Sequence, residues 1–407
     1  SGIENHALHS LGIYYENKNS LWINLFVPSK AEASILGAKV EQETDFPEGE
    51  KALVRLQLSS PKEFTVYLRR PWWAKKGFSV KVNGQELTAE ALLPKSSAEN
   101  VQYARAVKDR DRFGYFIEIK RQWKSGDTIE VTMPKSLYLE TAAGDERIVA
   151  IMWGPLVLAG DLGPERRWSR REEEQDEVRP VAVARDYPLL VAAPHEVSEW
   201  VKPVEGKTGH FVVSGIARKL QEPDRAVELE LVPFYRLHRR LYSAYWDYID
   251  ETEWKKRVAD YQKEQEKLKK LEEATAARVQ LGDPRSEKQF NFQTGDNINV
   301  QRVLGHTSRR GRTWFSVDLP ISGISRPALH ITYYSEERLR TCRFSLSVDG
   351  VKISGEEITR VPSPGFIEKE YPLTESLIKG KNKITVKFQA EPESEIAPVV
   401  VIRLLKK

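Results

Sequence analysis

Side chains able to bind metal or transfer protons occur together near the start of the chain, at Glu4, Asn5, His6 and His9. On a helix, His6 and His9 are three residues apart and share a face, whereas Glu4 and His6 do not. A metal site here would need further ligands from elsewhere, since no HExxH spacing is present. The residues alone therefore leave two interpretations, a site and a purely structural role, and the structural one is favoured.

A single cysteine, Cys342, limits the available chemistry. It excludes an intramolecular disulfide and any zinc site that needs two cysteine ligands. The sequence contains no GxSxG, P-loop or GxGxxG motif, and the spacing of its 59 acidic residues selects no pair for glycoside hydrolysis.

Two segments combine aromatic and arginine side chains, Arg69–Trp73 and Pro233–Tyr248. Such side chains offer flat faces for stacking on sugar rings and forked donors for hydroxyl groups. The alternative is that Trp and Tyr fill the cores of β-sandwiches, as they often do. Core packing is the favoured interpretation, and sugar contact is the functional alternative.

The elements that position these residues are mainly β-strands. Apolar residues alternate with polar ones over much of the chain, as at Phe64, Val66 and Leu68, and turn signals such as Asn83-Gly84 separate the runs. Two segments have the spacing of helices instead. They predict a short helix over residues 4–16 and a long one over Glu253–Arg278. The pattern predicts a mainly β protein with two β-sandwich domains, a middle β region and one long helix.

One predicted strand of the last β-domain has an apolar face and a face of mixed composition. Phe315, Val317 and Leu319 lie on one face, so that Trp314 lies on the other with Ser316 and Asp318. We expect the mixed face to point outward and Trp314 to stack on sugar or to dock on a neighbouring domain. Docking is favoured, because three arginines nearby could pair with acidic groups on the long helix: Arg309, Arg310 and Arg312.

The charge balance limits the range of partners. Lys and Arg number 63 against 59 Asp and Glu, for a net charge of +4 over 407 residues. This near balance argues against nucleic acid and membrane surfaces as partners. The longest mostly apolar run, Val149–Gly160, contains Gly154 and Pro155 and is too short to span a bilayer as a helix.

Several motifs, in order, resemble one enzyme family. Ser1–His6 resembles the end of a Cys-Cys-x-Gly-Thr-Gly-Met-Glu-Asn-His segment of bacterial β-L-arabinofuranosidases of glycoside hydrolase families 127 and 146. Ser1 stands at its Thr and Ile3 at its Met. The further matching segments are Leu21–Ser29, Glu43–Pro47, Leu68–Trp72, Val82–Gly84, Trp123–Asp127, Trp153–Gly160, Pro233–His238, Tyr242–Trp246, Asp283–Glu287 and Trp314–Leu319.

The resemblance implies a domain order. Residues 1–19 would be the end of a catalytic (α/α)6 barrel, and residues 20–160 a β-sandwich. Residues 161–284 would form a middle accessory region with the long helix at about 253–278, and residues 285–407 a C-terminal β-sandwich. The missing barrel is then the expected partner of this chain.

The resemblance also implies a chemistry that this chain does not carry. The family uses a cysteine nucleophile, a zinc ion held by cysteines and a glutamate, and a second glutamate as acid/base. Cys342 matches none of these positions, so no catalytic or metal-binding residue and no cofactor is predicted here. Only Glu4, Asn5 and His6 lie within the motif, and they are the candidate substrate contacts.

The implied function is that of a non-catalytic C-terminal portion of a glycoside hydrolase acting on β-L-arabinofuranosides in plant-type glycans. Whether the chain counts as an enzyme therefore depends on the barrel. Arabinose-containing glycans are the expected ligands, and the resemblance favours a periplasmic or extracellular location. The alternative is a stand-alone carbohydrate-binding or scaffold β-sandwich module.

Overall fold

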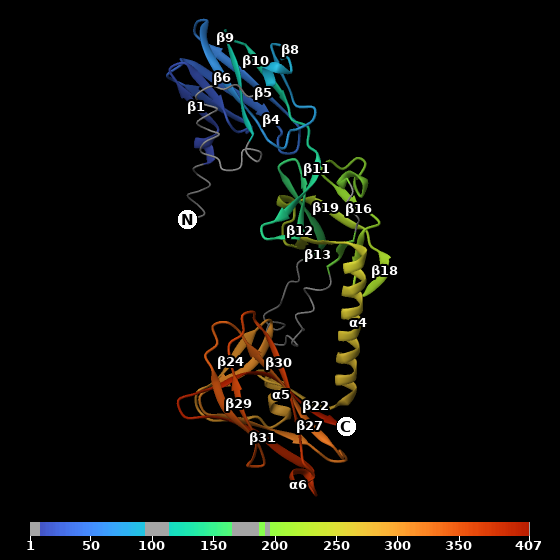
Figure 1. Ribbon diagram of the computed structural model, residues 1–407. Coiled ribbons are helices and arrows are strands. Elements are labelled where there is room, and N and C mark those ends of the chain that lie inside the picture. Colours follow the sequence, from blue (N-terminus) through green and yellow to red (C-terminus); the bar gives the residue numbers. More distant parts are fainter. Residues whose placement is uncertain (1–8, 94–113, 165–186, 192–195, 407) are drawn as a thin grey trace. The chain divides into compact units, whose positions relative to one another are not determined.

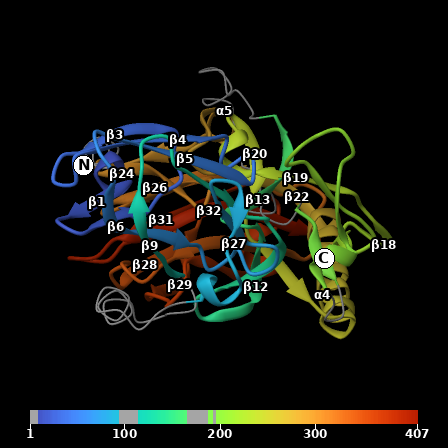
Figure 2. The same ribbon diagram turned by 90° about the horizontal axis from the view of Figure 1, so that it is seen from above.

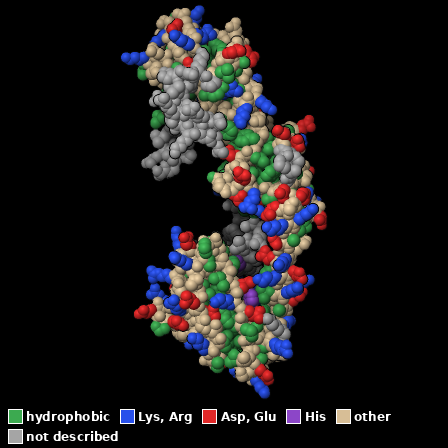
Figure 3. Space-filling view, viewed as in Figure 1, with side chains coloured by type: hydrophobic (Ala, Val, Ile, Leu, Met, Phe, Trp, Pro, Cys, Tyr) green, Lys and Arg blue, Asp and Glu red, His purple; other side chains and the backbone are tan. Residues whose placement is uncertain are grey.

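The computed structural model describes residues 9–93, 114–164, 187–191 and 196–406, and confirms the mainly β prediction (Figure 1). Its described residues fall into two compact units, of which the first ends at Trp254 and the second begins at Lys255. Acidic and basic side chains are interspersed on both units (Figure 3). None of the described helices combines the length and the apolar character needed to cross a membrane.

The first unit opens with a β-sandwich. Its strands are β1 (Tyr14–Asn17), β2 (Ser20–Ile23), β3 (Ser29–Ala33), β4 (Ala38–Thr44), β5 (Lys51–Leu58), β6 (Lys62–Arg70), β7 (Ser79–Val82), β8 (Gln85–Glu86), β9 (Tyr115–Trp123) and β10 (Thr128–Thr132). One sheet has the order β1-β2-β6-β9 and the other β3-β4-β5-β10-β7-β8. The paired strands β4 and β5 lie side by side in both views (Figure 2). Apolar side chains of both sheets, such as Leu21, Phe64 and Val54, share one core.

The Asn83-Gly84 turn joins β7 to β8 as predicted. Asn83 has φ of 52° and Gly84 of 78°, the left-handed backbone that a tight hairpin turn requires. The Asn83 side chain also fixes the turn, because its Nδ2 donates to Asp127 Oδ1 at 2.9 Å and its Oδ1 accepts from Thr128 N at 2.8 Å.

The predicted helix over residues 4–16 is wrong where the structure describes it. His9–Gly12 form a short 3-10 helix, η1, and Tyr14–Asn17 form the strand β1. β1 pairs antiparallel with β2, with Tyr14 opposite Ile23. Sheet pairing overrides the weak helical spacing of these residues, since the backbone bonds with β2 exist only in the extended conformation. Residues 4–8 lie outside the described part of the chain.

A third sheet completes the first unit. Its strands are β11 (Leu137–Ala142), β12 (Asp145–Trp153), β13 (Leu156–Pro164), β14 (Leu189–Val191), β15 (Val201–Pro203), β16 (Phe211–Val213), β17 (Ala217–Lys219), β18 (Glu222–Ala226), β19 (Leu229–Pro233), β20 (Arg240–Ser243) and β21 (Trp246–Ile249). The order is β15-β16-β19-β13-β12-β21-β14-β17-β18, with β11 on β12 and β20 on β13. Besides η1, the described residues of this unit form the short 3-10 helices η2 (Glu90–Leu92), η5 (Val197–Glu199) and η6 (Phe234–Arg236). Trp246 is fully buried in the core of this sheet.

The long helix, α4, spans Glu251–Ala274 and not 253–278. Residues Thr275–Gln280 form the strand β22, which pairs antiparallel with β32 (Ile396–Lys406). Ala277 and Val279 are buried there at alternate positions. Pairing in the sheet therefore makes the last residues of the predicted helix a strand. Trp254 is the buried residue of α4, whose other positions are exposed or half-buried.

The second unit is a β-sandwich, which confirms the second predicted sandwich. Its other elements are α5 (Pro284–Gln289), β23 (Gln293–Thr294), β24 (Ile298–Val303), β25 (His306–Gly311), β26 (Trp314–Pro320), β27 (Pro327–Ser335), β28 (Cys342–Val348), β29 (Val351–Ile358), β30 (Gly365–Pro372), α6 (Glu375–Ile378) and β31 (Lys383–Ala390). One sheet has the order β24-β25-β32-β27-β30, with β22 on β32, and the other β23-β26-β31-β28-β29. Their facing apolar side chains form one core.

Candidate functional site

A polar pocket of about 390 Å³ lies in the second unit, beside the hairpin of β24 and β25. Such a volume is within the range of small-molecule sites, roughly 300–1,000 Å³. Its lining is made of amides, guanidinium groups and one carboxylate, from Asn297, Asn299, Gln301, Arg310, Gly311, Arg312 and Glu395. Sequence reasoning missed this site. The signal in the sequence was the spacing of the amides at Asn297, Asn299 and Gln301, followed by the arginines Arg310 and Arg312.

The strand period places the amides together. Asn299 and Gln301 are two residues apart within β24, so their side chains point to the same side of the strand. Asn297 precedes the strand, has φ of 61°, and lines the same pocket. Arg310 stands opposite Asn299 in the antiparallel pair. The hairpin therefore gathers amide and guanidinium groups on one surface.

An ion pair forms the most fixed part of the pocket. Arg310 Nη2 lies 2.5 Å from Glu395 Oε1, and Arg310 Nη1 donates to Gln301 Oε1 at 3.2 Å. The side chains of Arg310 and Glu395 are only 29% and 20% exposed. Because Arg310 is held from two sides, its guanidinium has a defined position before any ligand arrives.

Gly311 brings two backbone segments into close contact. A Cβ at Gly311 would lie 2.0 Å from the Asn297 carbonyl oxygen, which real structures do not tolerate. The same carbonyl accepts from Arg312 N at 3.2 Å. A glycine is therefore required for the hairpin to bring Asn297 and Arg312 together at the pocket.

Three side chains of the pocket remain available for a ligand. The amides of Asn297 and Asn299 and the guanidinium of Arg312 make no side-chain hydrogen bond or ion pair with any other described residue. Asn299 and Arg312 are exposed. The pocket thus presents donors and acceptors to solvent beside an ion pair that is already satisfied.

Cys342 lies behind this ion pair and is unsuited to nucleophilic chemistry. It is fully buried, and its Sγ lies 3.2 Å from Arg340 O and 3.9 Å from Glu395 Oε1. Burial raises the pKa of the Cys342 thiol to about 11, and the Glu395 carboxylate adds to the rise. The group is therefore a protonated thiol at neutral pH, whereas a nucleophile must be a thiolate.

We expect Cys342 to be alkylated at least about 100-fold more slowly by iodoacetamide at pH 8 in the native chain than in denaturant. The raised pKa leaves about 0.1% of the thiol ionised at that pH, and burial restricts access further. Mass spectrometry of quenched samples measures the rate. Native alkylation as fast as in denaturant would contradict the buried position.

The arginine and tryptophan cluster at Arg69–Trp73 has a structural role. Arg70 Nη1 donates to the Tyr115 hydroxyl at 2.8 Å, and its guanidinium lies 4.9 Å from the centre of the Phe78 ring. Trp73 is only 6% exposed and belongs to the sandwich core. The favoured interpretation, core packing, describes this cluster.

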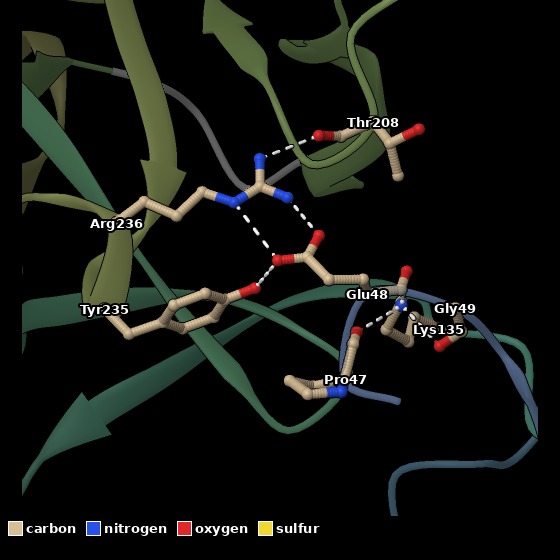
Figure 4. A network of polar contacts seen from close by, with 7 residues as sticks. All are labelled: Pro47, Glu48, Gly49, Lys135, Thr208, Tyr235 and Arg236. Carbon is tan, nitrogen blue, oxygen red and sulfur yellow. Dashed lines mark hydrogen bonds and ion pairs between the residues drawn. The ribbon is translucent and has the colours of Figure 1, made fainter. Parts of the chain in front are cut away.

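The aromatic segment Pro233–Tyr248 is divided between the core and the surface. Trp246 is fully buried, whereas Tyr242 and Tyr245 are 46% and 60% exposed. Tyr235 and Arg236 instead form polar contacts with Glu48 (Figure 4). Core packing, the favoured interpretation, therefore describes only part of the segment.

Glu48 is the centre of a network that connects the loop between β4 and β5 with η6. Arg236 binds both carboxylate oxygens of Glu48, the Tyr235 hydroxyl donates to one of them, and Arg236 Nη1 donates to Thr208 O at 2.8 Å (Figure 4). Burial raises the pKa of Glu48, but the hydrogen bonds from Tyr235 and Arg236 outweigh it and leave the pKa below its ordinary value. The carboxylate is therefore held ionised.

Lys135 supports the same loop from the other side. Its Nζ donates to the carbonyl oxygens of Pro47, Glu48 and Gly49 at 2.8, 2.9 and 3.0 Å. It also lies 4.0 Å from the centre of the Trp153 ring. Burial lowers the pKa of Lys135, against the raising effect of nearby carboxylates. The network joins the first sandwich to the third sheet and is a structural contact within the first unit.

The predicted partners of the C-terminal arginines are wrong. Arg309 pairs with Glu287 of α5 and Arg310 with Glu395, so neither pairs with α4. Phe315, Val317 and Leu319 lie in the core as expected, but Ser316 and Asp318 are also buried. Asp318 accepts from Asn291, Lys383 and Thr385. The mixed face of β26 is thus covered by neighbouring polar side chains.

Trp314 is half-buried, with Lys387 Nζ 4.6 Å from the centre of its ring. The candidate residues Glu4, Asn5 and His6 lie outside the described residues. Within the described part of the chain, no three or more His, Cys, Asp or Glu side chains come together in a way that could hold a metal ion.

Comparison with known families confirms the resemblance. Residues 20–135 match the model of the β-L-arabinofuranosidase GH127 middle domain. Residues 138–248 match a domain of unknown function, DUF4986, and residues 270–405 a family of unknown function, DUF6805. The chain thus contains, over residues 20–135, a β-domain that matches the middle domain of GH127 glycoside hydrolases.

Solved structures that match part of the chain include two GH127 proteins. One is the GH127 β-L-arabinofuranosidase Ara127N-Se from Geobacillus stearothermophilus T6, with 18% identity, a TM-score of 0.37 and coverage of 58% of this chain and 35% of that one. Another GH127 β-arabinofuranosidase has 18% identity and a TM-score of 0.37, with coverage of 58% of this chain and 37% of that one. The chain thus spans little more than a third of their length.

A family 35 carbohydrate-binding module from Clostridium thermocellum is also similar. It has 8% identity and a TM-score of 0.24, and the match covers 32% of this chain and 98% of the module. No curated protein matches the chain.

Proposed function

We propose that the chain is the non-catalytic accessory portion of a glycoside hydrolase that acts on β-L-arabinofuranosides in plant-type glycans. The observation that carries the proposal is the match of residues 20–135 to the GH127 middle domain. A catalytic barrel of (α/α)6 type is the proposed partner, and arabinose-containing glycans are the proposed substrates of the whole enzyme.

The state of Cys342 supports the non-catalytic role. A cysteine nucleophile needs an electropositive or metal-bound setting that lowers its pKa. Cys342 is instead buried beside a carboxylate with a pKa of about 11. The protonated thiol cannot attack a sugar carbon as a thiolate would, and its burial prevents a sugar from approaching it.

The test is hydrolysis of an aryl β-L-arabinofuranoside by the 407-residue chain, with and without zinc and a reductant. We expect release of the aryl group at the rate of the buffer blank, for the chain and for Cys342→Ala alike. Turnover that survives Cys342→Ala would place a different catalytic machinery in the chain. Turnover that Cys342→Ala abolishes would make the buried cysteine a nucleophile, and either result contradicts the proposal.

The second candidate function is carbohydrate binding by the C-terminal sandwich. It is favoured by one specific observation, the pocket in which the side chains of Asn297, Asn299 and Arg312 have no side-chain partner among the described residues. Binding of this kind and an accessory role are compatible, because accessory domains can hold a glycan near a catalytic domain.

A further inference from the structure

We propose that the pocket beside β24 and β25 binds a glycan through a sugar unit that carries a carboxylate, a uronate. The proposal deepens the carbohydrate-binding function proposed above and rests on it. The residues that carry it are Asn297, Asn299, Gln301, Arg310, Arg312 and Glu395.

The amides suit the hydroxyl groups of a sugar. A sugar hydroxyl both donates and accepts, and a side-chain amide offers one carbonyl acceptor and two N–H donors. Asn297 and Asn299 keep all of these groups unused by other described side chains, and Gln301 gives only its Oε1 to Arg310. A row of amides two residues apart can therefore bind neighbouring hydroxyls of one ring.

The charge of the pocket selects an acidic sugar. It contains two guanidinium groups and one carboxylate. Glu395 is already neutralised by Arg310 at 2.5 Å, which leaves the charge of Arg312 uncompensated among the described residues. A planar guanidinium binds a carboxylate through two parallel N–H···O bonds, and such charge-assisted bonds are stronger than those to neutral groups. A uronate carboxylate is the natural partner of Arg312.

The pocket is shaped before the ligand binds. Arg310 is held by Gln301 and Glu395, and the segment that carries Glu395 is fixed by the bond from Arg343 N to Ser394 Oγ at 2.7 Å. Gly311 keeps the hairpin backbones close together. Preorganised groups lose little conformational freedom on binding, which favours affinity for a small ligand.

The experiment compares ligands that differ only in the carboxylate. The full chain is titrated by calorimetry with methyl β-D-glucuronide and methyl β-D-glucoside, and with the corresponding galacturonide and galactoside. We expect at least one uronide to bind roughly tenfold or more tightly than its neutral counterpart. The preference should shrink as salt is added, because Arg312 is exposed.

Variants identify the residues. Arg312→Gln should remove the preference for the uronide, whereas Asn299→Ala should weaken binding of the acidic and the neutral sugar alike. Arg326→Gln is the matched control, since Arg326 is an exposed arginine of the same unit outside the pocket. Unchanged thermal unfolding of each variant shows that the fold is retained.

Four results would overturn the proposal. They are equal binding of acidic and neutral sugars, binding of acetate as tight as that of the uronide, a uronide preference that persists in Arg312→Gln, and an absence of binding to all four glycosides. None of these results changes the expected outcome of the hydrolysis assay. Failure of the uronide proposal can therefore be distinguished from failure of the proposed non-catalytic role.

Discussion

Replacing Glu287 by alanine is expected to lower the free energy of unfolding of the second unit by about 3–5 kcal/mol. Glu287 is only 7% exposed, and its two carboxylate oxygens accept from Arg309 at 2.8 and 2.7 Å. Its Oε1 also accepts from Gly282 N at 2.6 Å. The substitution leaves the half-buried Arg309 guanidinium and a backbone N–H without this acceptor, and both losses carry a desolvation cost.

The matched control is Glu357→Ala. Glu357 also forms an ion pair with an arginine, Arg343, at 2.8 Å, but the two side chains are 51% and 56% exposed. An exposed pair contributes about 1 kcal/mol or less. Denaturant unfolding of the full chain measures both variants, and hydrogen exchange of residues 278–290 localises the effect. Equal losses for the two variants would show that burial of the Glu287 pair does not matter.

A double variant separates the loss of the ion pair from the cost of leaving Arg309 without its partner. Glu287→Leu combined with Arg309→Met removes both charges and is expected to cost less than Glu287→Ala alone, because no unpaired ion stays buried. A double variant as unstable as the single one would attribute the loss to packing.

The substitution Lys135→Met is expected to lower the free energy of unfolding of the first unit by about 2–3 kcal/mol. Methionine keeps most of the aliphatic stem, but it offers no donor to the carbonyl oxygens of residues 47–49. The contact of the ammonium group with the Trp153 ring, at 4.0 Å, is lost as well. The loop that presents Glu48 to Arg236 then loses its support.

Lys120→Met is the control for Lys135. Lys120 is 69% exposed at its side chain and lies 3.5 Å from Glu63, so its removal should change the stability by less than about 1 kcal/mol. Denaturant unfolding followed by tryptophan fluorescence measures both variants. A change of stability in Lys135→Met no larger than in Lys120→Met would contradict a supporting role of the three carbonyl contacts.

The strand pattern was predictable because it is local. If the segment is a strand, alternation with a period of two places Phe315, Val317 and Leu319 on one face, and this apolar face is the one that is buried in the core. The Asn83-Gly84 turn needs only two residues that tolerate positive φ. The order of the motifs likewise predicted the family that the comparison confirms.

The end of α4 and the strand β1 were not predictable from spacing. Residues 275–278 continue a helical pattern in the sequence, but pairing with β32, more than 100 residues further on, draws them into a sheet. Tyr14–Asn17 pair with β2 in the same way. Helical propensity is worth a few tenths of a kcal/mol per residue, so a few interstrand bonds and buried apolar contacts outweigh it.

By itself the sequence determined the mainly β architecture, the sandwich cores and the match of residues 20–135 to the GH127 middle domain, because each depends on the order of residues in short segments of the chain. Only the tertiary structure decided which charges meet. Glu395 reaches Arg310 across 85 residues, and Glu48 reaches Arg236 across 188. Such ion pairs depend on register and on loop ends that lie far apart in sequence, and they leave no periodic signal.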